Sequence, residues 1–470
     1  MRDFRQRLYE HFRYRADALF NLLDSLSGNH HARAAVELSL NPWFDREYSS
    51  LHDAVDNFFM ASGAEQAQAE RTAGIAQRMA LLAAYLPVPE SRRCWLFGID
   101  TTAALRPVAQ KLADRSVVYR PHPAPGNKPI GIGHSYSVLA LLPEREAGAA
   151  PWVVPLRGLR VPTTSQACEV AAHQVETLLT NPQLPFGQAL SVEVVDSHYS
   201  RAPYLSPTGG YDHHVVIARL AANRTLYRLS VDGASAGPGH PRWYGAAFKL
   251  SDERTWGLPD HAEELLLCTR QGRRLQVKLQ RWHDLLMRGK RDAPRYERPL
   301  DLIRCTVTDE HGKAVFRRPM WLVVVGKRRR EITLAEGYEA YRQRFDLEHV
   351  CRFGKNQLLL DKYQTTDVEH EENGWELACL AYVQLWLAAP LAVELPMPWE
   401  RYLRKDSTRP LPGPSQVQRD FGSIIRPIGT PAQVPNRRGN SPGRAKGQSP
   451  GLRPCQPVVF KSQKRLKNAA

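Results

Sequence analysis

Cysteine pairs and long apolar runs are missing from this sequence. Its seven cysteines are dispersed over 470 residues and no C-x-x-C pair occurs, so neither a zinc knuckle nor a disulfide framework is indicated. No run of about 18 apolar residues is present, so no membrane span is expected. The N-terminus has no apolar signal core and no internal repeat is visible. These absences favour a cytoplasmic protein with reduced thiols.

The charge of the chain is unevenly distributed. Hydrophobic residues make up 43% and charged residues 24%, which is ordinary for a globular protein, but the net charge is +16. Residues 401–470 contain 15 Lys or Arg against two acidic residues, Asp406 and Asp420, and so hold +13 of this charge. The basic excess is therefore mostly a tail, which is expected to be disordered and able to bind DNA through counterion release.

The pattern of apolar residues predicts five segments. Helical spacing dominates the first segment, a helical domain for which DNA binding and simple packing on a core both stay open. The next has three β-rich runs, a helix and a fourth strand, then comes a β-rich insertion, and then a buried strand with further helices. The segments are 1–90 (helical), 94–204 (first part of an α/β core), 205–317 (insertion), 318–400 (second part of the core) and 405–470 (tail).

Two aspartates come at the ends of predicted buried strands. Asp100 follows WLFGI and Asp196 follows VEVV. An Asp in this position is commonly a turn residue or a helix cap. Two-metal phosphoryl transfer, however, requires several carboxylates to converge on cations about 3.5–4 Å apart. Strand ends hold such carboxylates rigidly, and Mg²⁺ prefers oxygen ligands.

The stretch YRQRFDLEHVCRFGK, residues 341–355, gives a possible third carboxylate. If it forms one helix, Tyr341, Arg344, Glu348 and Lys355 lie on a stripe about 60° wide. Glu348 could complete a metal site, Arg344 and Lys355 could contact phosphates, and Tyr341 could stack on a base. The alternative is a solvated helix with an Arg344–Glu348 ion pair.

The same residues resemble a known family. Tyr-x2-Arg-x3-Glu-x6-Lys is similar to the signature of DDE transposases of bacterial insertion sequences, in the branch with a Tyr-Arg-Glu-Lys helix. GIDTT around Asp100 and VVDSHYS around Asp196 resemble the two aspartate motifs of that family. The resemblance implies a ribonuclease H-like mixed sheet with flanking helices, interrupted by a β-rich insertion.

The resemblance also implies an activity. Asp100, Asp196 and Glu348 would be catalytic and would hold two Mg²⁺ ions, for which Mn²⁺ can substitute. The substrates would be double-stranded DNA at the transposon ends and at the target, cut and joined by a homodimer in the nucleoid. Tyr341, Arg344 and Lys355 would contact DNA. The run Lys327, Arg328, Arg329 and Arg330 leads toward this helix and is a further expected phosphate contact.

Alternatives remain at two levels. Asp232 and Asp212 compete with Asp196 for the second carboxylate, and His213, His214 and His240 are interpreted as structural. Trp243 and Trp256 could receive an extruded base or could simply be packed. The protein could also be a ribonuclease H-like nuclease without strand transfer, or an inactive DNA-binding protein derived from a transposase.

Overall fold

The computed structural model divides the chain into two compact units. The first unit comprises Met1–Val88, Thr101–Val170 and Asp346–Ala470, and the second comprises Pro89–Asp100 and Ala171–Phe345. The described residues are 1–58, 64–120, 126–145, 149–230, 243–269, 272–289, 295, 297–393, 411–436, 445–448 and 451–460.

Three parallel strands form the centre of the second unit. Strand β1 (Trp95–Leu105) pairs in parallel with β5 (Ser191–Val195), and β5 pairs in parallel with β6 (His214–Leu220). Their sequences are nearly continuous apolar runs, as expected for strands covered on both faces. All five residues of β5 are buried. The pairing stops at Ile99 and Val195, so the carboxyl end of β5 lies beside the middle of β1, which continues to Leu105.

The last residues of β1 belong to the first unit, where their neighbour is β3 (Ile130–Leu141). Strand β3 pairs antiparallel with β4 (Val154–Val161) and with the short strand β2 (Ser116–Tyr119). Helix α5 (Ala167–Thr180) connects β4 to β5. The hydrogen-bonded order β4-β3-β1-β5-β6, with a helix before β5, is that of a ribonuclease H-like sheet, and the predicted fold class is confirmed.

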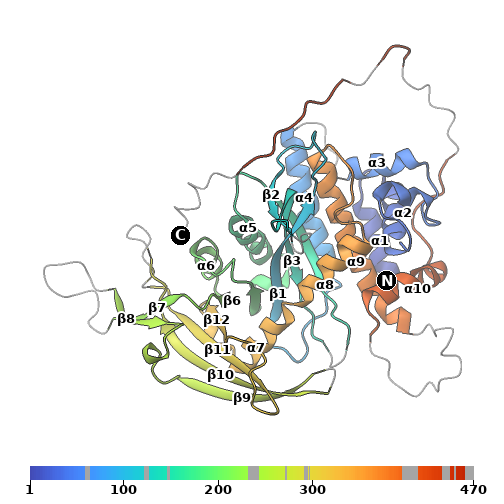
Figure 1. The fold of residues 1–470 in the computed structure, drawn as a ribbon. Helices are drawn as coiled ribbons and strands as arrows, with labels where there is room; N and C mark the ends of the chain where they lie inside the picture. The colour runs from blue at the N-terminus through green and yellow to red at the C-terminus, as the bar shows by residue number, and fades with distance from the viewer. Residues whose placement is uncertain are drawn as a thin grey trace. The chain divides into compact units, whose positions relative to one another are not determined.

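The β-rich insertion differs in extent from the prediction. Strand β6 was expected in the insertion, but it belongs to the core sheet because it pairs with β5. Strand β12 then pairs antiparallel with β6 and is followed in order by β11, β10 and β9, while β7 and β8 form a separate pair (Figure 1). The remaining strands are β7 (Thr225–Leu229), β8 (Tyr244–Lys249), β9 (His261–Cys268), β10 (Arg274–Leu285), β11 (Leu300–Asp309) and β12 (Met320–Val325).

Helix α9 (Val368–Val393) is the core helix of the first unit. It contacts α2 (Ala16–Ser27) and α3 (Tyr48–Asp56) from the N-terminal segment, which therefore does not form a domain of its own. Within the described ranges it is the one helix long and apolar enough to cross a membrane. However, 72% of its apolar 18-residue stretch is buried inside the protein. Such burial is typical of the core helix of a soluble protein.

A buried polar cluster fixes α9 to the N-terminal helices. Arg5 on α1 (Arg2–His11) donates to Asp24 on α2 at 2.5 Å and to Gln384 on α9 at 2.9 Å. Gln384 in turn donates to Asp24 at 3.0 Å. Because each charge is paired and hydrogen-bonded, the cluster is compatible with burial.

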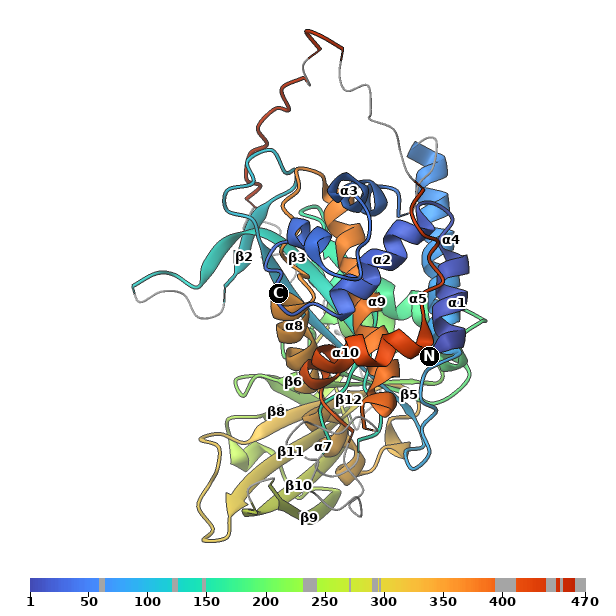
Figure 2. The same ribbon diagram turned by 90° about the vertical axis from the view of Figure 1, so that its right-hand side faces the viewer.

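Part of the C-terminal tail is folded, which corrects the expectation of disorder over 405–470. Helix α10 (Pro414–Ile428) lies beside α9 (Figure 2). Val417, Phe421 and Ile424 recur at helical spacing and are buried, so a local apolar face outweighs the basic composition of the tail. Farther along, Val459 N donates to Arg115 O at 2.7 Å beside β2.

The other helices complete the described fold. They are α4 (Ala64–Ala83), α6 (Ala202–Thr208), α7 (Leu334–Gln343) and α8 (Asp346–Gln357), with short 3₁₀ turns at Ala35–Leu40, Pro185–Gly187, Glu253–Thr255 and Arg329–Glu331.

Candidate active site

Asp100 and Asp196 occupy neighbouring positions in the second unit. The last paired residues of β1 and β5 are Ile99 and Val195, and each aspartate comes directly after one of them. Adjacent strands lie about 4.8 Å apart, so this register brings Asp196, at the carboxyl end of β5, close to Asp100 on β1. The expectation that Asp100 ends its strand is wrong, because β1 continues to Leu105. Both residues are half-buried, and Asp196 Oδ1 accepts a hydrogen bond from His198 N at 2.8 Å.

Arg344 and Tyr341 belong to the same cluster. Arg344 Nη1 donates to Asp100 Oδ2 at 3.3 Å, and its side chain is only 8% exposed. Its guanidinium lies 4.9 Å from the ring centroid of Phe345 and 5.7 Å from that of Tyr341. Burial raises the pKa of the Tyr341 hydroxyl, Arg344 lowers it and the negative charge of Asp196 raises it further. The second unit therefore brings four predicted site residues together.

The stretch 341–355 is not a single helix. Helix α7 ends at Gln343 and α8 begins at Asp346. The backbone hydrogen bonds tighten at this point, because Arg344 N bonds to Tyr341 O and Phe345 N to Arg342 O, three residues back instead of four. The predicted single stripe is therefore wrong: Tyr341 and Arg344 belong to the end of α7, and Glu348 and Lys355 to α8.

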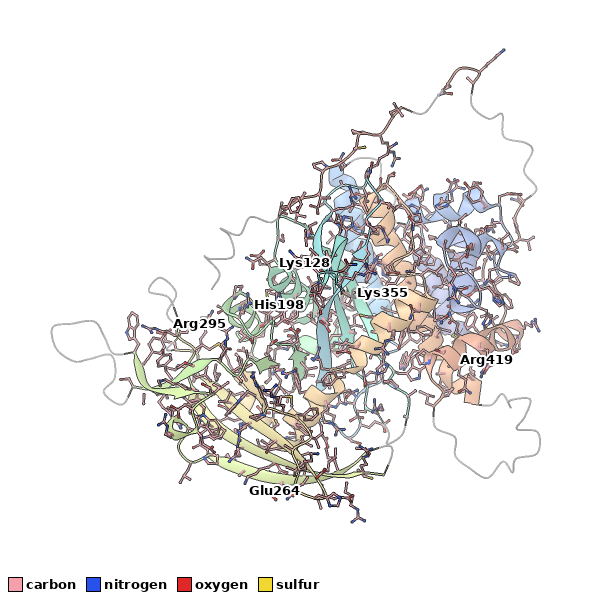
Figure 3. The ribbon with its side chains drawn as sticks, viewed as in Figure 1. Lys128, His198, Glu264, Arg295, Lys355 and Arg419 are labelled. Atoms are coloured by element: carbon pink, nitrogen blue, oxygen red, sulfur yellow. The ribbon has the colours of Figure 1, made fainter. Side chains whose placement is uncertain are left out.

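Helix α8 belongs to the first unit. Glu348 is exposed in its first turn, where a carboxylate interacts favourably with the helix dipole. Lys355, labelled in Figure 3, donates through Nζ to the backbone carbonyl of Ala103 on β1 at 2.6 Å. Burial lowers the pKa of its ammonium group. Lys355 thus anchors α8 to the strand that carries Asp100.

The basic run 327–330 forms ion pairs within the protein. Lys327 pairs with Asp212, Arg328 pairs with Glu331 at 2.6 Å, and Arg330 pairs with Asp284. Arg329 bridges Asp284 at 2.5 Å and the buried Asp301 at 3.0 Å. Burial alone would raise the pKa of Asp301, but Arg281, His283 and Arg329 hold it below its usual range. Arg329 is thus structural, whereas Lys327 and Arg330 remain accessible.

The structure gives other roles to those alternative site residues that it describes. Asp212 is exposed and pairs with Lys327, outside the ends of β1 and β5. His214 is buried and bonds to Glu193 at 3.2 Å, as expected for a structural histidine. Trp256 packs against Trp321, with ring centroids 5.0 Å apart, and is a core residue. Asp232 and His240 lie outside the described residues.

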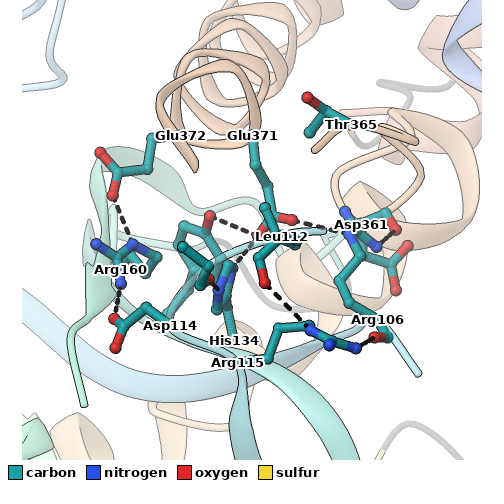
Figure 4. A network of polar contacts seen from close by, with 12 residues as sticks. Arg106, Leu112, Asp114, Arg115, His134, Arg160, Asp361, Thr365, Glu371 and Glu372 are labelled. Atoms are coloured by element: carbon teal, nitrogen blue, oxygen red, sulfur yellow. Dashed lines mark hydrogen bonds and ion pairs between the residues drawn. The ribbon is translucent and has the colours of Figure 1, made fainter. Parts of the chain in front are cut away.

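A second polar network, around Glu371 of α9, was not predicted (Figure 4). This buried carboxylate accepts from Arg106 Nε at 2.8 Å and Tyr136 OH at 2.8 Å, and lies 2.9 Å from His134 Nδ1. Burial alone would raise the pKa of Glu371, but His134 and Arg106 lower it. In the sequence, the sign of this network is an acidic residue near the start of an apolar helix. Such a local pattern does not identify partners that lie more than 230 residues away in the chain.

The donor chemistry of the strand ends fits a divalent cation. Two half-buried carboxylates on adjacent strands offer the oxygen ligands that Mg²⁺ prefers. Among the residues that the structure describes, no group of three or more His, Cys, Asp or Glu side chains is gathered as a metal site. The fit therefore rests on Asp100 and Asp196.

Comparison with known proteins agrees with this geometry. No curated protein matches the sequence. The family described as DDE superfamily endonuclease matches residues 7–289, which include Asp100 and Asp196. The match covers more than half of the chain. It supports nuclease activity on DNA, and this family generally uses divalent metals. The chain therefore belongs to the DDE superfamily endonuclease family.

Proposed function

We propose that this protein is a DNA transposase, which cleaves DNA at transposon ends and joins the freed ends to target DNA. The observation that carries the proposal is the position of Asp100 and Asp196, each directly after the last residue that pairs β1 with β5 in a ribonuclease H-like sheet. Membership of the endonuclease family supports the cleavage step. Strand transfer is the further step that the Tyr-Arg-Glu-Lys signature suggests.

In this proposal Asp100, Asp196 and Glu348 hold two Mg²⁺ ions, for which Mn²⁺ can substitute. Bound metal ions would activate the attacking oxygen and neutralise charge on the phosphate. The assignment of Glu348 rests on the signature, whereas the two aspartates are also supported by strand register.

The neighbouring residues position these carboxylates and the DNA. Arg344 holds Asp100 through its ion pair, and its guanidinium has further N–H donors with which to bind a phosphate. Tyr341 fills the space beneath it, since its ring is fully buried, which supports a packing role over stacking on a base. Lys355, Lys327, Arg328 and Arg330 are proposed as phosphate contacts.

The proposed partners are the two transposon ends and the target, bound by a homodimer in the nucleoid. Joining two ends requires two active sites held together, which supports the dimer. Arg329 is the exception among the proposed contacts, because its ion pairs with Asp284 and Asp301 favour a structural role.

A strand-transfer assay with Mg²⁺ and DNA carrying the terminal inverted repeats of the element tests the proposal. The expected result is nicking at the repeat ends followed by joining to a target plasmid, both abolished in Asp100→Asn. Cleavage without joining would identify a nuclease that lacks strand transfer. Binding without cleavage would identify an inactive DNA-binding protein.

A further inference from the structure

A cavity in the second unit is lined by residues other than Asp100 and Asp196. Its volume is about 370 Å³, within the range of sites that bind small molecules. It lies between the end of α6, the segment before β11 and the segment after β12. The residues that matter for its chemistry are Ser206, Arg295, Glu297, Arg298, Lys327 and Arg329.

The charge of this cavity is strongly positive. Four of its lining residues are basic, and Glu297 is its one acidic lining residue among those described. Lys327 and Arg329 are already neutralised by their ion pairs. Arg295 and Arg298 differ, because within the described ranges neither guanidinium makes an ion pair.

Ser206 holds both of these arginines in place. Arg295 Nη2 donates to Ser206 Oγ at 2.8 Å, and Arg298 Nη1 donates to Ser206 O at 2.5 Å. Two guanidinium groups are therefore fixed to one residue and contact neutral oxygens. Arg295, labelled in Figure 3, is half-buried. Burial lowers its pKa and the positive charge of Arg298 lowers it further, so the two cations destabilise each other.

The wall of the cavity is built by two glycines. A Cβ atom at Gly209 would lie 2.6 Å from Val325 Cγ1, so only glycine lets the end of α6 approach β12 this closely. Gly326 has a φ of +136°, and a Cβ there would lie 2.4 Å from His214 O. The cavity is thus preformed by close backbone packing.

We propose that this cavity binds a phosphate group through Arg295 and Arg298. The planar fork of arginine matches phosphate oxygens in pairs, and a tetrahedral phosphate accepts from two guanidinium groups at once. An anion between them would relieve the repulsion between the two cations. The phosphate comes either from the DNA backbone, in which case the inference rests on the proposed function, or from a free phosphate compound.

Binding measurements on the full-length chain test this proposal. Arg295→Gln and Arg298→Gln are each compared with Arg274→Gln, which removes the same charge from an exposed position on β10. Inorganic phosphate is titrated by calorimetry and a labelled DNA duplex by fluorescence anisotropy. Circular dichroism confirms folding, and the exposed Arg298 keeps the test valid if Arg295→Gln is unstable.

We expect each pocket variant to weaken phosphate binding about tenfold, since each removes a charge-assisted hydrogen bond, and a tenfold change is about 1.4 kcal/mol. Loss of both phosphate and duplex affinity relative to Arg274→Gln assigns the phosphate to DNA. Loss of phosphate affinity alone assigns it to a free phosphate compound. Affinities equal to those of Arg274→Gln for both ligands overturn the proposal. These measurements record binding and not cleavage. Failure of the phosphate proposal can therefore be told apart from failure of the proposed transposase function, which would appear as inactivity in the strand-transfer assay.

Discussion

Arg344 Nη1 lies 3.3 Å from Asp100 Oδ2, although 244 residues separate them in the chain. Arg344 follows the end of α7, and Asp100 lies on β1 directly after its last residue paired with β5. The ion pair therefore joins one member of the Tyr-Arg-Glu-Lys signature to the first of the two aspartates. An arginine exposed at the surface would leave the Asp100 carboxylate in contact with solvent. The Arg344 side chain is only 8% exposed and holds that carboxylate in a defined position.

The carboxylates of Asp100 and Asp196 are expected to be essential for cleavage of DNA but not for binding it. Asp100→Asn and Asp196→Asn should each lower the Mg²⁺-dependent cleavage rate on the order of 10³-fold, because several kcal/mol of charge stabilisation would be lost. Glu348→Gln should do the same if the signature assigns the third ligand correctly. Gel shift and single-turnover cleavage provide the two readouts. Asp212→Asn, an exposed aspartate outside the strand ends, is the control and should cleave normally.

Lys355 can be tested through the salt dependence of binding. If it contacts a phosphate, Lys355→Ala should reduce the slope of log K against log salt by about 0.9 for duplex DNA. Lys362→Ala is a matched control, because Lys362 also lies in the first unit and pairs with Asp361. A slope that does not change in Lys355→Ala, accompanied by reduced stability, would instead assign Lys355 to anchoring α8 on the Ala103 carbonyl.

Glu371 should make stability depend on pH. Its pKa in the folded protein is lowered from the ordinary value of 4.5, so its contribution is fully present above that value. The contribution is lost as pH falls through the lowered pKa. Glu371→Gln should therefore destabilise the protein by about 3–5 kcal/mol at pH 7, since a buried pair is broken. The difference from wild type should shrink below pH 4.5 in urea unfolding experiments; a difference that does not vary with pH would contradict the ionised network.

The helix in the C-terminal tail should contribute to stability. Phe421 is fully buried within the first unit, so Phe421→Ala should lower the free energy of unfolding by about 3–5 kcal/mol. Val434→Ala is the control, because Val434 is 83% exposed and a surface change is worth within about 0.5 kcal/mol. Equal midpoints for the two variants in denaturant would mean that α10 does not pack as described.

Local patterns in the sequence were sufficient for the core sheet and for the positions of Asp100 and Asp196 beside its central strands. WLFGI before Asp100 and VEVV before Asp196 are mostly apolar runs, and they form the paired parts of the central strands β1 and β5. The ribonuclease H-like order of strands follows from these runs and the helix between them.

The remaining features depend on contacts that a local pattern does not contain. The stretch around Phe345 has helical spacing throughout. Helix α7 nevertheless ends there, because the backbone N–H groups bond to the carbonyl three residues earlier instead of four. Phe421 lies in a basic, proline-rich segment whose composition obscures the short apolar face of α10, and that helix packs on α9. Glu371 meets Arg106, 265 residues earlier, through folding alone.

The account depends most on Asp196 being the carboxylate that acts beside Asp100. Asp196→Cys tests this directly, because a thiolate ligand favours softer metals over Mg²⁺. The measurement is the cleavage rate of a duplex with transposon ends, in Mg²⁺ and in Mn²⁺, with Asp232→Cys assayed in parallel. We predict that Asp196→Cys is inactive in Mg²⁺ and partly restored in Mn²⁺, while Asp232→Cys is active in both. Full activity of Asp196→Cys in Mg²⁺, together with inactivity of Asp232→Cys, would contradict the assignment.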